Sequence, residues 1–285
     1  MKQLVVVSGK GGTGKTSVTA AFASLMSGKV VADCDVDAAD MHLLLDPRAV
    51  REETFTGGKA ARIDPERCIQ CGRCRELCRF GAIREDFVVD PIACEGCGVC
   101  VWNCPQRAIA LEEDRSGRWF VSETRCGPLV HARLGPAQEN SGKLVTIVRN
   151  EAKKIAEERG LETVLIDGPP GIACPVMASL TGADAALVVI EPTLSGVHDF
   201  QRLAQLLGHF KMRGVACINK FDINPELSER LEKEAESSEV PILGRIPFDP
   251  AVTRAQVERK TVIEAGDGPA NRAIRALCER VQERL

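Results

Sequence analysis

Eight of the chain's thirteen cysteines lie between residues 68 and 104, in two runs with identical spacing. Each run follows C-x2-C-x2-C-x3-C, first as CIQCGRCRELC and then as CEGCGVCVWNC. Three thiolates this close in sequence can surround three corners of one metal cluster from a single loop. The fourth cysteine is then expected to open a helix and to reach a second cluster. The spacing therefore predicts a metal-bound segment, for which zinc and disulfides are the alternatives.

The same segment is an internal duplication with a period of 26 residues. Ile63-Asp64-Pro65 returns as Val89-Asp90-Pro91, and Ala82-Ile83 returns as Ala108-Ile109. Zinc sites usually take four ligands as two pairs, and disulfides are not expected without a secretory signal. Spacing and duplication together resemble a bacterial ferredoxin, in which two pseudo-symmetric halves enclose two [4Fe–4S] clusters.

The resemblance to ferredoxins implies which cysteines share a cluster. One cluster would be held by Cys68, Cys71, Cys74 and Cys104, and the other by Cys94, Cys97, Cys100 and Cys78. The chain departs from the ferredoxin pattern at one point, because Arg79 follows Cys78 where a proline is expected. We expect this guanidinium either to raise the potential of the second cluster or to meet an acidic partner.

Length and composition restrict the remaining possibilities. The 285 residues exceed a ferredoxin and suit about two domain-sized units. A net charge of −3 gives no electrostatic reason to expect nucleic acid or an anionic membrane as the main partner. No apolar run is long enough to span a bilayer, and no signal peptide precedes the first apolar residues. The sequence therefore predicts a cytoplasmic protein.

A phosphate-binding loop follows the first predicted strand, residues 4–8. Its sequence, Gly9-Lys10-Gly11-Gly12-Thr13-Gly14-Lys15-Thr16, matches G-x-x-x-x-G-K-[ST] between a strand and a helix. Glycines let backbone N–H groups close around phosphates. We expect Lys15 to reach the β- and γ-phosphates and Thr16 to bind Mg²⁺. Ser17 is expected at the α-phosphate.

Lys10 narrows the assignment of this loop. K-G-G-x-G-K-T resembles the deviant Walker A motif of the MinD/ParA/Mrp superfamily, in which this lysine reaches across a dimer to the partner's nucleotide. The resemblance implies ATP as the nucleotide and a homodimer, or a heterodimer with a paralogue, around it. The alternative is that Lys10 neutralises phosphate within its own subunit.

Acidic residues follow the second predicted strand, residues 29–32, as DCDVDAAD. The carboxyl ends of parallel strands are where such sheets bind ligands. By the family resemblance, Asp33 supports Mg²⁺ and Asp35 orients the attacking water. Asp37 and Asp40 are equally consistent with a solvated helix N-cap.

A second acidic motif, DGPPG, follows the predicted strand at residues 163–166. Asp167 has the position of a Walker B acid, which holds Mg²⁺ through water. The glycine that ends the motif, Gly171, resembles the family's switch II, where its N–H would sense the γ-phosphate.

The base-binding residues are predicted near the C-terminal end of the sheet. Asn219-Lys220-Phe221-Asp222 reads like the guanine motif N-K-x-D, but MinD-type relatives use an asparagine here to contact adenine. Pro247-Phe248-Asp249-Pro250 resembles the family's base-binding loop, which implicates Pro247 and Asp249. These residues do not separate the two bases, whereas Lys10 favours ATP.

Several residues have open roles. His131 is expected to be structural on a strand edge, and the stretch from His131 to Lys143 is a candidate coupling element between clusters and nucleotide. Cys174 is interpreted first as a small buried residue and second as a thiol near the dimer seam. The role of Cys126 stays open. The amphipathic segment 270–285 is predicted to pack on its own domain rather than on a membrane.

A chain that carries all these motifs resembles a MinD-superfamily ATPase with an inserted ferredoxin domain. The resemblance implies a doubly wound, mostly parallel α/β sheet of the P-loop NTPase type, formed by residues 1–58 and 118–285. Residues 59–117 would form the ferredoxin-like α+β insert. Hydrolysis of ATP to ADP and phosphate would depend on Lys10, Lys15, Asp35 and Asp167.

The nucleotide switch would then act on the two clusters. We expect first a role in assembly, insertion or carriage of an iron–sulfur or mixed-metal cofactor for a client metalloprotein. The alternatives are an ATP-gated electron donor that resembles the nitrogenase iron protein and serves a redox partner, and a MinD-like spatial regulator.

Overall fold

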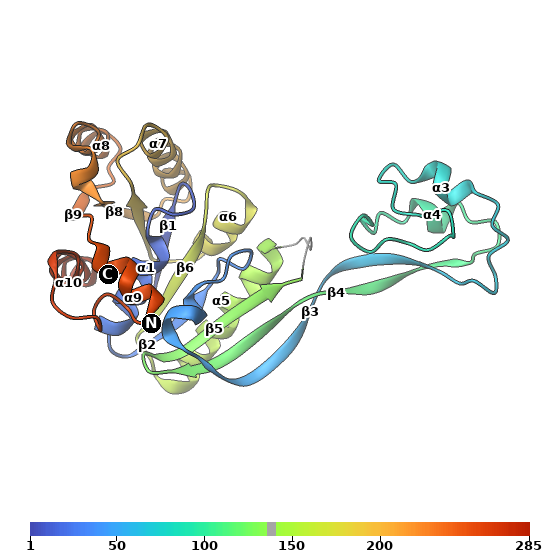
Figure 1. Ribbon diagram of the computed structural model, residues 1–285, viewed down its shortest axis with the longest axis horizontal. Coiled ribbons are helices and arrows are strands. Elements are labelled where there is room, and N and C mark those ends of the chain that lie inside the picture. Colours follow the sequence, from blue (N-terminus) through green and yellow to red (C-terminus); the bar gives the residue numbers. More distant parts are fainter. Residues whose placement is uncertain (136–140) are drawn as a thin grey trace. The chain divides into compact units, whose positions relative to one another are not determined.

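The computed structural model describes residues 1–135 and 141–285, which separate into two compact units (Figure 1). The first comprises Met1–Glu52, Trp119–Arg133 and Ser141–Leu285, and the second comprises Glu53–Arg118 with Leu134 and Gly135. The division falls within two long strands, β3 (Arg48–Ile63) and β4 (Ile109–Thr124). None of the helices in the described residues is long and apolar enough to cross a membrane.

The first unit is built on a mostly parallel sheet. The described strands form one nine-stranded sheet in the order β3-β4-β5-β2-β6-β1-β7-β8-β9. All pairings among β5, β2, β6, β1, β7, β8 and β9 are parallel. These strands are β1 (Lys2–Ser8), β2 (Lys29–Asp33), β5 (Gly127–Leu134), β6 (Thr163–Pro170), β7 (Ala185–Ile190), β8 (Arg213–Asn219) and β9 (Ile242–Ile246).

Helices cover both faces of this sheet. Leu4 and Val6 belong to the core that contains α1 and α10, while Val5 and Val7 point to the opposite face and are equally inaccessible to solvent. Strands buried on both faces are continuous apolar runs, as the sequence of β1 shows. The helices are α1 (Lys15–Leu25), α2 (Met41–Leu45), α5 (Ser141–Arg159), α6 (Cys174–Leu180), α7 (Leu194–His209), α8 (Pro225–Ser237), α9 (Pro250–Val257) and α10 (Pro269–Gln282), with a 3₁₀ turn at Phe221–Ile223.

The predicted α/β fold with a mostly parallel sheet is confirmed, and so is the packing of the C-terminal helix. Ile274, Leu277, Cys278 and Val281 of α10 are buried in the core beside α1. The apolar face of α10 is therefore used within its own unit and is not available to a membrane.

One strand was not predicted, and one local prediction is wrong. The polar stretch after Asp46-Pro47 forms strand β3, whose side chains are mostly exposed. Its polar composition conceals the strand, because β3 is held by pairing with β4 rather than by burial. His131 does not lie on a strand edge, since β5 is flanked by β4 and β2.

The second unit repeats its backbone as well as its sequence. Its two short helices, α3 (Arg73–Leu77) and α4 (Val99–Trp102), start after Gly72 and Gly98, whose φ angles are 83° and 79°. The halves also exchange hydrogen bonds. The N–H of Asp64 donates to the carbonyl of Ala108 at 2.8 Å, and the N–H of Asp90 donates to the carbonyl of Ala82 at 2.7 Å. These reciprocal bonds relate the halves by a pseudo-two-fold axis.

Cysteines form much of the core of this unit. Ala61, Cys74, Ile83 and Ile109 are the buried members of its hydrophobic cluster. Among the partly buried residues packed around them are four further cysteines, Cys78, Cys94, Cys100 and Cys104. The unit therefore has few aliphatic side chains with which to stabilise itself.

Candidate functional site

The phosphate-binding loop joins β1 to α1 in a conformation that depends on glycine. Gly12 and Gly14 have φ angles of 80° and 92°, in the left-handed region. At Gly9 a Cβ atom would lie 2.1 Å from the Cβ of Asp199, so α7 packs directly against the loop. The predicted P-loop context of strand, loop and helix is thus present.

Lys15 lies at the centre of an acidic site. Its Nζ is 3.0 Å from Asp167 and 3.4 Å from Asp35, and the residue is only 5% exposed. Burial alone would lower the pKa of Lys15, but the charges of Asp167, Asp35 and Asp33 outweigh it and raise the pKa. Lys15 is therefore a cation, which an anionic ligand can compete for.

Asp167 connects strand β6 to helix α1. The hydroxyl of Thr16 donates to one carboxylate oxygen at 2.8 Å, and that of Thr19 donates to the other at 2.7 Å. Thr16 and Asp167 are a hydroxyl and a carboxylate of the kind that hold Mg²⁺ in P-loop proteins. The structure thus brings together the predicted lysine, threonine and Walker B acid.

Asp33 and Asp35 take different positions at the end of β2. Asp33 is fully buried, and its carboxylate accepts the N–H of Asp35 and of Met41, each at 3.2 Å. Burial, with the neighbouring charges of Asp167 and Asp35, raises the pKa of Asp33 well above its ordinary value. Burial also raises the pKa of Asp35, which Lys15 only partly offsets.

Of the two residues expected as a solvated N-cap, Asp40 takes that position and Asp37 does not. Asp40 occupies the N-cap position of α2, but its side chain makes no capping hydrogen bond. Asp33 instead accepts an N–H from the first turn of α2. Asp37 is exposed.

Lys10 is held within its own subunit. Its Nζ donates to the hydroxyls of Thr193 and Ser195 at 3.1 and 3.2 Å, and lies 3.4 Å from the carboxylate of Glu191. Glu191 also pairs with Lys220 at 2.8 Å. Burial would raise the pKa of Glu191, but the hydrogen bonds and charges of Lys220 and Lys10 hold it below its ordinary value.

The residues predicted to bind the nucleotide base come from the ends of strands β8 and β9 and lie against the phosphate-binding loop. The amide of Asn219 donates to the carbonyl of Thr13 at 2.7 Å. The carboxylate of Asp222 accepts the N–H of Phe248 at 2.7 Å, so the NKFD and PFDP segments are in contact. Asp249 is the N-cap of α9 and accepts the N–H of Ala251 at 2.9 Å.

Further predicted contacts are already paired within the protein. The N–H of Gly171 donates to the carbonyl of Ser8 at 2.8 Å. The hydroxyl of Ser17 accepts a hydrogen bond from Gln256 at 2.8 Å. Pro247 is half-buried at the start of the PFDP segment. A nucleotide contact with the backbone of Gly171 would require this loop to exchange a partner.

Cys174 corrects one expectation. It is exposed, at the start of α6, whereas a small buried residue was the first interpretation. The residue follows the turn at residues 171–173 rather than lying in a strand, so its side chain does not enter the core. Cys126 is half-buried beside the hydroxyl of Ser24 at 3.5 Å.

His131 belongs to a buried group that its sequence context does not reveal. Its ring stacks on Phe120 at 5.0 Å and lies parallel to His42, with ring centroids 6.1 Å apart. Nε2 is 3.1 Å from the hydroxyl of Ser122. Burial, with His42 and Arg133 nearby, lowers the pKa of His131 to about 4. Within the predicted coupling stretch, residues 136–140 lie outside the described residues.

The eight cysteines line two cavities in the second unit. One is bordered by Cys68, Cys71, Cys74 and Cys104, and the other by Cys78, Cys94, Cys97 and Cys100. Each cavity takes three cysteines from one half of the duplication and the fourth from the other half. The structure therefore brings together the same two groups of four that the ferredoxin resemblance implies.

The fourth cysteine of each run does not open a helix, as the spacing was expected to require. Cys78 is the C-cap of α3, and Cys104 follows α4. The third cysteine of each run lies inside the helix, so the fourth comes four residues later, just beyond its end.

Backbone N–H groups point at three of the sulfurs. Ala82 and Ala108 donate to Cys78 and Cys104, four residues earlier, at 3.4 and 3.3 Å. Ala61 donates to Cys94 at 3.4 Å. Such bonds favour thiolates and tune iron–sulfur clusters. Among the described residues, however, no three metal-binding side chains converge on a single ion. Ligands of a cluster lie at separate corners and need not converge.

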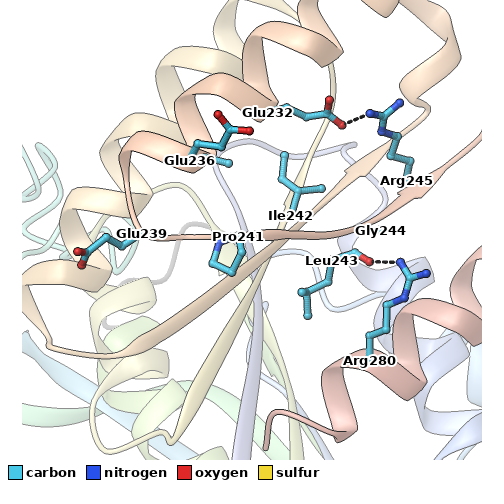
Figure 2. Close-up of a pocket in the computed structure, with 10 residues that line it drawn as sticks. Glu232, Glu236, Glu239, Pro241, Ile242, Leu243, Gly244, Arg245 and Arg280 are labelled. Atoms are coloured by element: carbon cyan, nitrogen blue, oxygen red, sulfur yellow. Dashed lines mark hydrogen bonds and ion pairs between the residues drawn. The ribbon is translucent and has the colours of Figure 1, made fainter.

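A groove beside the edge strand β9 lies elsewhere in the first unit (Figure 2). Arg245 pairs with Glu232 of α8, and Arg280 of α10 donates to the carbonyl of Leu243 at 2.7 Å. None of the residues that line the groove belongs to the P-loop or the acidic site. We assign no ligand to it.

Comparison with known proteins agrees with this geometry. An uncharacterized protein of Methanocaldococcus jannaschii is 33% identical over 285 residues, which cover 99% of this chain and 96% of that protein. The pyruvate synthase subunit PorD of Methanothermobacter marburgensis is 36% identical over 53 residues, 19% of this chain and 65% of that subunit.

A solved structure shares the fold. The septum site-determining protein MinD of Pyrococcus horikoshii, complexed with Mg-ADP, superposes with a TM-score of 0.60 at 18% identity and covers 99% of this chain and 96% of its own. The family described as the CobQ/CobB/MinD/ParA nucleotide binding domain matches residues 4–262. The chain thus belongs to the CobQ/CobB/MinD/ParA nucleotide-binding family.

Proposed function

We propose that this protein is an ATPase whose nucleotide state controls two resident [4Fe–4S] clusters. The single observation that carries the proposal is the pair of cavities, each lined by four cysteines drawn from both halves of the duplication. Nucleotide binding does not by itself require eight cysteines around two cavities, and a metallocentre that accompanies the nucleotide would account for them.

Mg-ATP would bind at the P-loop. Lys15 would leave Asp167 and Asp35 for the phosphates, and the hydroxyl of Thr16 with Asp167 would hold Mg²⁺. Asp35 would orient the attacking water, and Asp33 would support the loop from which Asp35 projects. The MinD structure with Mg-ADP supports the choice of an adenine nucleotide.

The second unit supplies the ligands of the clusters. Cys68, Cys71, Cys74 and Cys104 would hold one, and Cys94, Cys97, Cys100 and Cys78 the other. Bound clusters of this type accept and release single electrons. The protein's part is to exclude water from the inner cysteines, such as Cys74, and to direct backbone N–H groups at the sulfurs.

Electron donation is the role that the geometry supports best. Five of the eight cysteines, Cys74, Cys78, Cys94, Cys100 and Cys104, belong to the core of their unit. Release of a cluster would remove the interactions that hold this core together. Clusters of this kind are therefore better suited to stay in place and transfer electrons than to be handed over.

Assembly or carriage of a cofactor, the first expectation from sequence, is the second candidate. The exposed thiol of Cys174, seven residues after Asp167, favours it. A thiol there is accessible to a cluster or metal in transit, close in sequence to the segment that responds to nucleotide. The client metalloprotein would then replace the redox partner.

A dimer would form around the nucleotide. In the single chain Lys10 is neutralised by Glu191, so reaching a partner's nucleotide requires this ion pair to break. Such an exchange would link dimerisation to ATP binding. A MinD-like spatial regulator would share this step, but it leaves the two cysteine cavities without a purpose.

Iron and sulfide analysis of anaerobically purified protein, together with ATP hydrolysis, tests the proposal. We expect about eight iron atoms and eight sulfides per chain, as two four-iron clusters require. Cys74→Ala should lose about half of the iron and Cys174→Ala none. Zinc, or fewer than about four irons per chain, would contradict the two clusters. Absence of hydrolysis in iron-replete protein would contradict the ATPase.

A further inference from the structure

The two cysteine cavities have unlike rims although their backbones are related by pseudo-symmetry. Arg73 and Ile69 line the cavity of Cys104, and the residues 26 positions later are Val99 and Glu95 at the cavity of Cys78. Arg79, which follows Cys78, likewise corresponds to Pro105 in the second run. The arginines are thus not part of the repeated framework and need a separate explanation.

Arg73 and Arg79 differ from Arg75 and Arg84, which lie close to them in the sequence. Arg75 lies 3.5 Å from Glu85, and Arg84 lies 3.6 Å from Asp86. For Arg73 and Arg79 no carboxylate lies at ion-pairing distance among the described residues, and the Arg79 guanidinium contacts only a ring, that of Phe80 at 5.1 Å. One acid, the exposed Glu76, shares helix α3 with Arg73.

Exposed apolar side chains accompany these two charges. Ile69 at the first cavity is 61% exposed, and Leu77 and Phe80 at the second are 41% and 38% exposed. Arg73 and Leu77 are four residues apart on α3, so they lie on the same face of the helix and reach from one cavity rim to the other. Apolar residues mixed with arginine are the composition found in protein interfaces.

We propose that this surface, defined as Ile69, Arg73, Leu77, Arg79 and Phe80, is the docking site for an acidic one-electron carrier protein. The unpaired guanidinium groups would attract the carrier's carboxylates, and the apolar residues would pack beneath it. The inference rests on the proposed function, because a carrier docked here would exchange electrons with the clusters. Both cavities border the surface, so the transfer distance is short whichever cluster is used.

The probe is an acidic flavodoxin, mixed in the oxidised form with the reduced full-length protein. In the reaction one cluster loses one electron, and the oxidised flavin gains that electron and a proton from water to become the neutral semiquinone. The semiquinone is blue, so its appearance in a stopped-flow instrument gives the second-order rate constant. We expect this rate constant to fall steeply as ionic strength rises.

The deciding variant is Arg73→Glu/Arg79→Glu, compared with Arg75→Glu/Arg84→Glu, which changes the net charge equally. We expect the first pair to lower the rate constant at low salt at least tenfold, roughly the lower limit of electrostatic steering. The control pair should change it less than about threefold, and the two should converge at high salt. If the charge-reversal variant loses iron, Arg73→Gln/Arg79→Gln replaces it. Its rate constant should lie between that of the wild type and the value expected for the charge reversal.

Other results would overturn the inference. Equal rates for the two pairs, or a rate indifferent to salt, would show that no docking occurs here. A shift in the midpoint potentials large enough to explain the slower rate would show that the arginines tune the clusters instead. Loss of binding to a single-stranded RNA oligomer without any change in rate would show a nucleic-acid surface. Iron-free protein would overturn the proposed function as well, whereas iron-replete protein with a salt-independent rate would overturn this inference alone.

Discussion

The two units of the molecule hold their functional groups by different means. Around the P-loop, strands such as β1 are buried on both faces, and the charged residues Lys15 and Asp167 neutralise each other within that scaffold. In the second unit the cysteines themselves are core residues: Cys74 is buried, and Cys78, Cys94, Cys100 and Cys104 pack against the same hydrophobic cluster. The nucleotide site is therefore organised by the fold, whereas we expect the fold of the cysteine unit to depend on the proposed clusters.

Removal of iron should have the largest effect, and it should affect the two units differently. Where ligands form the core, the free energy of metal binding is folding free energy, so apoprotein should unfold between residues 59 and 117. The P-loop unit should keep its structure and its affinity for nucleotide. Hydrogen exchange and limited proteolysis of holo- and apoprotein would measure both effects. Equal protection of residues 59–117 in the apoprotein would refute the dependence on metal.

Lys15→Ala tests whether the cysteine unit is independent of the nucleotide site. Loss of its charge from the phosphates should lower the rate of ATP hydrolysis by about 10²–10³-fold. Iron content should not change, because the cysteine unit does not need the nucleotide to fold. Lys153→Ala, at an exposed lysine of α5, is the control. A variant that loses iron together with activity would show that the two units are not independent in this respect.

His131 makes the stability of the P-loop unit dependent on pH. The pKa of His131 is about 4 in the folded protein and about 6.5 in the unfolded chain. Its contribution to the free energy of unfolding is therefore complete above pH 6.5 and is lost as the pH falls towards 4. The loss at pH 5 should be about 2 kcal/mol. Urea unfolding at pH 7.5 and 5 should show this difference in wild type and much less in His131→Gln. His209→Gln, at an exposed histidine, should behave as wild type.

Glu191→Gln should have the smallest effect of these changes, and it should strengthen a function, ATP binding, rather than weaken one. The carboxylate competes with phosphates for Lys10 and Lys220, and the half-exposed pairs are worth about 0.5–1 kcal/mol. Removing its charge should therefore tighten ATP binding about two- to fivefold, as titration calorimetry would measure. Glu258→Gln, which removes only an exposed ion pair with Lys260, is the control. Weaker binding in Glu191→Gln would mean that the carboxylate organises the site instead.

The features that the sequence predicted are encoded by residues close together in the chain. The P-loop and both cysteine runs are short motifs with fixed spacing, and the parallel strands are apolar because they are buried on both faces. Their positions follow from residues close together in the chain. The same holds for α10, whose period of apolar residues identifies its buried face.

Contacts between distant residues explain what was missed. Lys10 pairs with Glu191, and His131 stacks beside His42, although nothing near either residue indicates its partner. The exposure of Cys174 depends on how the turn before α6 leaves the sheet. Strand β3 was missed because it is held by pairing with β4, which no local pattern encodes.

Anaerobic EPR spectroscopy of the reduced protein, with and without Mg-ATP, measures whether the nucleotide controls the clusters. We expect signals from two interacting [4Fe–4S] clusters that change when Mg-ATP binds to the wild type and do not change in Lys15→Ala. Two clusters whose signals are the same with and without Mg-ATP would contradict this expectation, because the nucleotide would then have no influence on the metallocentres.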